Sequence, residues 1–230
     1  HNIDVVVVNG ENIAGGRGIS RKTLDEIYRA GADIVTSGNH IWDQKEIVSF
    51  IDDEPFLIRP ANYPEGAPGK GYCIYPFKAK NIGVINVSGR TFMPPMDCPF
   101  QKVDEILKEI KNQCDIILVD IHAEATSEKI AMGFYLDGKV TCVVGTHTHV
   151  QTADNRILPK GTAYISDLGM VGPYNSSLGI NVNNAIDKFI TCRPVRFEMA
   201  EGPNIFSAVV LELAEDNSVK SFERILFNEE

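Results

Sequence analysis

Cysteine is scarce in this sequence, and the cysteines that it has follow no recognisable pattern. They are odd in number and scattered, with no C-x-x-C spacing: Cys73, Cys98, Cys114, Cys142 and Cys192. A disulfide framework would need an even set at characteristic spacings. The sequence therefore predicts a reduced protein, with a cytoplasmic location as the simplest setting.

Basic charge and long apolar runs are also lacking. The 22 Lys and Arg residues are outnumbered by 31 Asp and Glu, which gives a net charge of -9. A protein that grips long nucleic acid needs a basic face for the phosphate backbone, so we exclude that partner but not a small anionic substrate. No apolar run approaches the roughly 18 residues of a membrane helix, and no signal segment opens the chain, so we predict no membrane role.

Hydrophobic residues make up 43% of the 230 residues, enough for one domain spanning 1–230 with its own core. The first fifty residues alternate β-α-β-α, with strands at 5–8 and 32–37, a helix that begins after Ser20, and a helix over 43–51. A long irregular loop follows at 59–71. The pattern further predicts helices at 99–112 and 127–136, and strands at 71–75, 81–87, 115–120, 140–145, 161–167, 193–200, 205–212 and 221–226. These elements predict a two-layer sheet core flanked by helices.

The histidines are grouped in a way that indicates a metal-binding site. Four of the five histidines lie in three short segments: Gly38-Asn39-His40, Asp120-Ile121-His122-Ala123-Glu124 and Gly145-Thr146-His147-Thr148-His149. Neutral imidazole, with carboxylate or amide oxygen, holds hydrolytic metal ions. Glu11, Asn39, His122 and His147 each come just after a predicted strand, and the carboxyl ends of strands are where ligand sites assemble. The sequence thus predicts one metal pocket at this edge.

Each of these residues also has an ordinary structural interpretation. A single histidine after a strand is commonly structural, and the turn 9–12 that holds Glu11 is also an ordinary polar turn. Glu11 could bridge two cations because a carboxylate offers two charged oxygens. In the His-x-His segment, alternate residues of an extended chain point to opposite faces, so His147 and His149 either share a centre through a bend or serve one ion each.

The neighbours of these residues have separate predicted roles. His40 is better placed as a general acid than as a ligand, because imidazole titrates near neutral pH; the alternative is that it donates to a backbone carbonyl. Asp120 and Glu124 flank His122, and we expect them to orient ligands without binding metal themselves. The Gly-rich segment 169–179 either lines a phosphate or ribose pocket or is a plain surface loop.

Four motifs together carry a family resemblance: Asn9-Gly10-Glu11-Asn12, Gly38-Asn39-His40, Asp-Ile-His-Ala-Glu-Ala-Thr at 120–126 and Gly-Thr-His-Thr-His-Val-Gln-Thr-Ala-Asp at 145–154. They resemble the motifs of the calcineurin-like metallophosphoesterases, and more narrowly those of the YmdB-type branch known as 2′,3′-cyclic-nucleotide phosphodiesterases. The loops 59–71, 89–95 and 153–161 also look like that branch. The resemblance covers essentially the whole chain.

This resemblance implies a fold and a ligand set. The fold is a four-layer α-β-β-α sandwich of two mixed sheets flanked by helices. Glu11 would bridge two metal ions, either iron or manganese, and the remaining ligands would be Asn39, His122 and His147 at one ion and His149 with Asn12 at the other. His40 would be the catalytic histidine. The family normally opens with a strand ending in Gly-Asp, which this sequence lacks, and we expect the full protein to be longer.

The resulting hypothesis is a binuclear phosphodiesterase. It would hydrolyse small phosphodiesters such as 2′,3′-cyclic nucleotides through a metal-bound hydroxide, with His40 protonating the departing oxygen. One alternative is a metallophosphatase or nuclease that acts on another ester. Another is a non-catalytic regulatory protein that binds a nucleotide without turning it over. The sequence is also compatible with a homo-oligomer.

Overall fold

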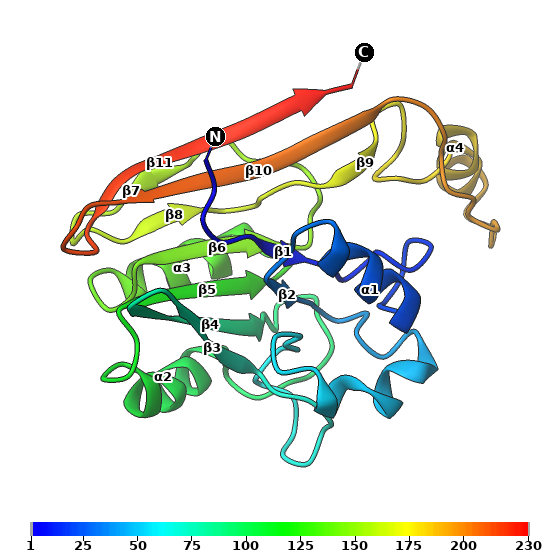
Figure 1. Cartoon of the computed structure of the whole chain (residues 1–230). Helices are drawn as coiled ribbons and strands as arrows, with labels where there is room; N and C mark the ends of the chain where they lie inside the picture. Colours follow the sequence, from blue (N-terminus) through cyan, green and yellow to red (C-terminus); the bar gives the residue numbers. More distant parts are fainter. Residues whose placement is uncertain (1, 230) are drawn as a thin grey trace.

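A computed structural model describes residues 2–229 and shows a mixed α/β fold with several sheets (Figure 1). The largest sheet has six strands in the order β3 (Tyr72–Phe77), β4 (Lys80–Ser88), β5 (Ile116–His122), β6 (Cys142–Thr146), β8 (Ala163–Ile165) and β7 (Arg156–Ile157). Strands β4, β5, β6 and β8 are parallel, and the two edge strands run antiparallel to them. The carboxyl ends of the four central strands therefore share one edge.

Two smaller sheets complete the strand content of the described residues. Strands β1 (Val7–Asn9) and β2 (Ile34–Thr36) form a parallel pair. Strands β9 (Val171–Pro173), β10 (Asn204–Leu213) and β11 (Val219–Asn228) form an antiparallel sheet, whose long strands β10 and β11 run along one side of the molecule (Figure 1).

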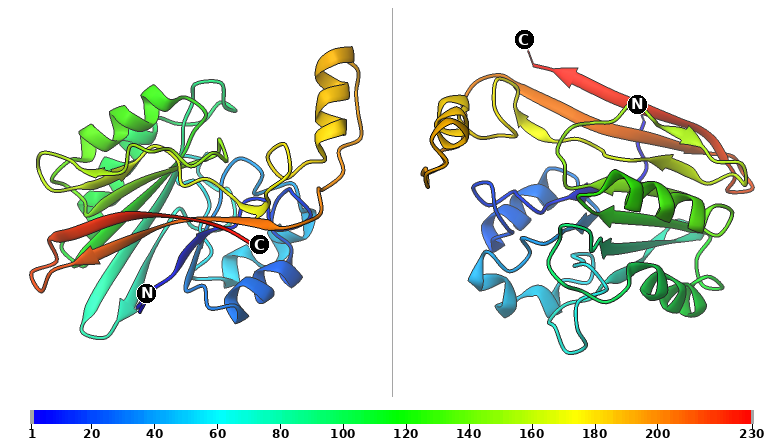
Figure 2. Two further views of the ribbon diagram at one scale, coloured as in Figure 1. Left: turned by 90° about the horizontal axis from the view of Figure 1, so that it is seen from above. Right: turned by 180° about the vertical axis from the view of Figure 1, so that it is seen from behind.

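The core lies on both faces of the six-stranded sheet. Apolar side chains of α2 (Pro99–Ile110) and α3 (Thr126–Leu136) pack on one face, and the view from behind shows both helices there (Figure 2). On the other face, Phe222 of β11 packs with residues of β6 and β8. A separate cluster joins α1 (Arg21–Arg29) to β2. The predicted mixed α/β fold with more than one sheet is therefore present.

Helix α1 begins directly after Ser20, as the sequence predicts. Ser20 is the N-cap, and its hydroxyl accepts a hydrogen bond from the backbone N–H of Thr23. Such a cap satisfies an N–H group that has no partner within the helix.

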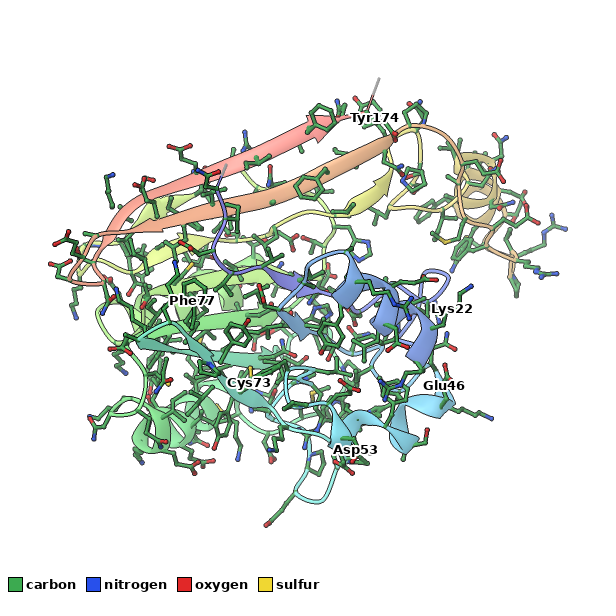
Figure 3. All side chains as sticks on the ribbon, viewed as in Figure 1. Lys22, Glu46, Asp53, Cys73, Phe77 and Tyr174 are labelled. Atoms are coloured by element: carbon green, nitrogen blue, oxygen red, sulfur yellow. The ribbon has the colours of Figure 1, made fainter. Side chains whose placement is uncertain are left out.

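Outside the core, Lys22, Glu46 and Asp53 lie on the surface, whereas Cys73 is buried (Figure 3).

The α-helix predicted over 43–51 is wrong. The segment forms two short 3₁₀ helices, Lys45–Ser49 and Ile51–Asp53, separated by Phe50 with φ -140°. The side chain of Gln44 donates to the carbonyls of Ala14 and Arg17, which ties the segment to the loop before α1. These tertiary contacts outweigh the apolar spacing that predicted a regular helix.

The strand predicted over 193–200 is also wrong, and a helix before it was not predicted. Only Met199 in that segment forms a β-bridge, with Ile180, because no neighbouring strand is available to pair with the rest. Helix α4 (Val182–Thr191) precedes it and projects from the body of the molecule (Figure 2). The helical signal was available in its apolar residues, which are spaced three and four apart: Val182, Ala185, Ile186, Phe189 and Ile190.

Several other predicted strands have different bounds. The apolar run 5–8 contributes a strand only from Val7, and β1 is half-buried instead of fully buried because it pairs with β2 alone. The strand predicted over 161–167 is the shorter β8, and the segment 169–179 contains β9. Within residues 2–229, no helix has both the length and the apolar character needed to cross a membrane.

Candidate metal centre

Four strands deliver the predicted ligands to one place. Glu11 follows β1, Asn39 follows β2, His122 is the last residue of β5, and His147 follows β6. The parallel pairing of β5 with β6 places Thr146 opposite His122, so His147 begins where the sheet ends. The carboxyl-edge location predicted from the sequence is what the topology produces.

The side-chain atoms of these residues converge on the Nε2 atom of His122. The distances to that atom are 2.6 Å from Glu11 Oε2, 3.0 Å from Asn39 Oδ1 and 3.0 Å from His147 Nδ1. One ligand atom from each of Glu11, His122 and His147 lies within 4.8 Å of the others. Glu11 and His122 are buried, whereas His147 is half-buried.

The hydrogen-bond network assigns the proton of His122 to its other nitrogen. Thr146 Oγ1 lies 2.7 Å from Asp120 Oδ1 and 2.9 Å from His122 Nδ1. Because the hydroxyl has a single proton and donates it to the carboxylate, its oxygen accepts from Nδ1–H of His122. With this proton on Nδ1, Nε2 carries the lone pair that faces Glu11.

His147 is oriented in the corresponding way. Its Nε2 atom lies 3.1 Å from Glu124 Oε2, so Nε2–H donates to that carboxylate and Nδ1 carries the lone pair that faces His122. Electron-pair donors that converge without a hydrogen between them repel one another unless a cation lies among them. Two imidazole nitrogens, a carboxylate and an amide oxygen are a ligand set suited to a transition metal. The residues present therefore fit a metal ion.

His149 and Asn12 lie beside this group and are not part of it. Asn12 Nδ2 donates to His149 Nε2 at 3.2 Å. Burial lowers the pKa of His149, and the nearby Glu11 carboxylate acts against that shift. The division of the ligands into two groups that share Glu11 stays a prediction.

His40 forms hydrogen bonds with two carboxylates: its backbone N–H contacts Glu11, and its ring contacts Asp43. Its N–H donates to Glu11 Oε1 at 2.8 Å, and its Nδ1 lies 2.9 Å from Asp43 Oδ2. The ring partner is thus a carboxylate and not a backbone carbonyl. The His40 side chain is 29% exposed, which leaves the ring accessible to a substrate. Sequence reasoning missed Asp43, although its position three residues after His40 was a usable signal.

The electrostatics of the site favour a bound cation. Burial acts to raise the pKa of Glu11, but its polar neighbours, among them the backbone N–H of His40, hold that pKa below its ordinary value. Burial is the main cause that lowers the pKa of His147 and that of His149. Near neutral pH the site therefore presents an anionic Glu11 carboxylate with neutral rings at His147 and His149, the protonation states that bind metal.

Gly38 is required by the close packing of the site. A Cβ atom on this residue would lie 2.3 Å from His122 Nε2, closer than two such atoms can approach. The glycine of the Gly-Asn-His motif thus lets the loop after β2 pass next to the ligand nitrogen. Its presence in the motif therefore has a steric reason.

Comparison with known proteins identifies the family. The sequence matches the YmdB-like protein family over residues 1–225. The chain belongs to this family. It is 53% identical over 226 residues to the 2′,3′-cyclic-nucleotide 2′-phosphodiesterase of Bacillus subtilis (strain 168). The aligned residues make up 97% of this chain and 85% of that protein.

Solved structures of similar proteins support the fold. A hypothetical protein from Thermus thermophilus superposes with a TM-score of 0.94 at 41% identity, covering 99% of this chain and 89% of that chain. A novel phosphatase from Mycoplasma pneumoniae gives a TM-score of 0.91 at 36% identity, covering 98% and 83%. The predicted family is thereby confirmed, and so is the prediction that this YmdB-like protein is a hydrolase.

Proposed function

We propose that this YmdB-like protein is a phosphodiesterase that hydrolyses small phosphodiesters such as 2′,3′-cyclic nucleotides. The observation that carries the proposal is the convergence of Glu11, Asn39 and His147 on the lone-pair nitrogen of His122. The activity named for the Bacillus subtilis relative supports the choice of substrate. The net negative charge of the chain favours a small substrate over extended nucleic acid.

We infer two transition-metal ions, iron or manganese, that share Glu11. Asn39, His122 and His147 would complete one site, and His149 with Asn12 would belong to the other. Cations bound there would neutralise phosphate charge and lower the pKa of a water molecule. The four-layer sandwich is part of the same proposal, and the packing of helices on one face of the six-stranded sheet and of β11 on the other supports it.

His40 would act as the general acid. During hydrolysis a water oxygen forms a bond to phosphorus, one ester P–O bond breaks, and the departing oxygen takes a proton. Asp43 holds Nδ1 of His40, so Nε2 is the nitrogen left to give that proton. The carboxylate of Glu11 fixes the backbone of His40, which ties the acid to the ligand cluster.

A phosphatase acting on another ester is the second candidate, because the Mycoplasma pneumoniae relative is described as a phosphatase. It would use the same ligands and differ in the loops around them. Hydrolysis of a monoester but of no diester would select it over the phosphodiesterase.

The test is turnover of a panel of esters with added Mn²⁺: a 2′,3′-cyclic nucleotide, an acyclic diester and a phosphate monoester. We expect the cyclic nucleotide to be the best substrate. His40→Ala should lower its kcat by about 10²–10⁴-fold, the usual contribution of a general acid, while Mn²⁺ binding is retained. Lys45→Ala, at an exposed position on the same segment, is the matched control and should leave kcat unchanged. Absence of diester hydrolysis by the Mn²⁺-loaded wild-type protein would refute the proposal.

A further inference from the structure

The segment that carries His147 and His149 has an unfavourable backbone. His147 has φ 106° and His149 has φ 65°, both in the left-handed region that residues other than glycine seldom occupy. Such positions are energetically unfavourable and persist only where the surrounding structure enforces them. The bend has a use, because it overcomes the alternation that would turn two such side chains away from each other.

The residue between the two histidines is held by a single carboxylate. Asp167 Oδ2 accepts the backbone N–H of Thr148 at 3.0 Å and the Thr148 hydroxyl at 2.8 Å. Asp167 is fully buried, and its other oxygen accepts the N–H of Gly169 at 2.9 Å. Thr148 is therefore fixed through both its backbone and its side chain, at the centre of the bend.

A buried lysine completes this arrangement. Lys129 of α3 is 1% exposed, and its Nζ lies 2.7 Å from Asp167 Oδ2. Burying two charges is costly, and an apolar pair in their place is often as stable, so stability alone is a weak reason for an ion pair here. A charged partner does fix the position of the carboxylate that accepts from Thr148. The charge pair is thus better explained by the geometry that it imposes.

We propose that Lys129 and Asp167 are positioning residues that hold the His147-Thr148-His149 bend in the shape needed to bind metal. The inference rests on the proposed function in one respect, namely that the two histidines are ligands. Neither Lys129 nor Asp167 binds metal itself. Both act through Thr148, and their loss would release the strained backbone toward an extended form.

Asp167→Asn is the main test, with Asp137→Asn as its matched control. Asp137 is also a buried carboxylate that accepts backbone N–H groups, from Lys160 and Thr162, but it lies at the opposite end of the parallel strands. We expect Asp167→Asn to weaken Mn²⁺ binding by about 10–100-fold, the range seen when a group that supports a ligand is lost. Asp137→Asn should lower the Tm without changing Mn²⁺ affinity.

A second readout does not involve metal. In the metal-free protein, amide hydrogen exchange at Thr148 should be faster in Asp167→Asn than in wild type and unchanged in Asp137→Asn. Should Asp167→Asn fail to fold, Thr148→Val removes only the hydroxyl contact and should produce the same two changes to a smaller degree.

The outcomes separate the two proposals. Wild-type Mn²⁺ affinity and wild-type Thr148 exchange in a folded Asp167→Asn protein would overturn the positioning role. A wild-type protein that binds no Mn²⁺ would overturn the proposed metal chemistry, and with it the ligand role on which this inference rests.

Discussion

Thr146→Val is the substitution whose effect follows most directly from the site. The hydroxyl of Thr146 donates to Asp120 and accepts from His122, and all three residues are buried. Valine keeps the volume of threonine but has neither a donor nor an acceptor. The substitution therefore leaves a buried carboxylate without one of its donors and a buried ring N–H without its acceptor.

The expected loss of stability comes from the two atoms that lose their hydrogen-bond partner, Asp120 Oδ1 and His122 Nδ1. Each buried polar group left without a partner costs about 1–3 kcal/mol, so the loss of stability is about 2–6 kcal/mol. For a chain of this size, each kcal/mol lowers the Tm by about 2–4 °C. The ring of His122 is also freed from the protonation state that directs its lone pair toward Glu11, so Mn²⁺ affinity should fall by about 10–100-fold.

Thr162→Val is the matched control for the stability part of this effect. Thr162 is equally buried, and its hydroxyl donates to Val140 O at 2.7 Å and accepts from Gly138 N at 2.9 Å. Calorimetric melting and Mn²⁺ titration of both variants separate the two effects. A similar Tm loss in both, with Mn²⁺ affinity reduced only in Thr146→Val, is expected. Equal Mn²⁺ affinities in the two variants would refute the assignment of the His122 proton.

Three further predictions concern neighbouring residues. Asp43→Asn weakens the hydrogen bond that orients the His40 ring and should lower kcat by up to about 10²-fold. In a protein that already carries His40→Ala, the same substitution should lower kcat no further. Additive losses of kcat in steady-state assays would contradict the pairing of Asp43 with His40. Gly38→Ala should abolish Mn²⁺ binding in a titration, because its Cβ would lie 2.3 Å from His122 Nε2; retained affinity would show that the loop can shift. Burial lowers the pKa of His149 below the ordinary value of 6.5, so the unfolded chain binds a proton that the folded chain does not. The metal-free protein should therefore lose stability to urea as the pH falls below that value, and His149→Gln should lose less; equal pH slopes would argue against the burial of a neutral ring.

The location of the site could be predicted from the sequence because it depends on short-range patterns. Apolar β-branched runs predict buried strands, and polar residues that follow such runs must come to the sheet edge. Glu11, Asn39, His122 and His147 all follow this rule. The prediction required neither the strand order nor the contacts among the ligands.

The partners of the ligands were only partly predictable. The sequence predicts that Asp120 and Glu124 orient ligands, and the structure shows that Asp120 contacts His122 through Thr146, whereas Glu124 contacts His147. Asp167 was not predicted, because it is 19 residues from Thr148 and meets it only after β8 has paired with β6. Contacts of this kind depend on topology, which local patterns do not encode.

Helix α4 and the segment after it show the opposite kind of failure. The spacing of apolar residues in 182–190 indicates a helix, but the alternation in 193–200 favours a strand equally well. Alternation predicts a strand only where a partner strand exists, and the structure offers Met199 a single bridge. A local pattern therefore identifies the site more reliably than it identifies peripheral elements that have little to pack against.

The sequence Thr146-His147-Thr148-His149 alternates anchors with candidate ligands. Thr146 is bonded to the buried carboxylate of Asp120 in β5, and Thr148 to that of Asp167 after β8, so His147 is fixed on both sides by two different strands. Because β6 lies between β5 and β8, the position of His147 depends on the pairing of all three strands. The same buried hydrogen bonds that stabilise the sheet edge therefore set the geometry of the ligands, and a metal bound there would in turn stabilise the folded state by binding it in preference to the unfolded chain.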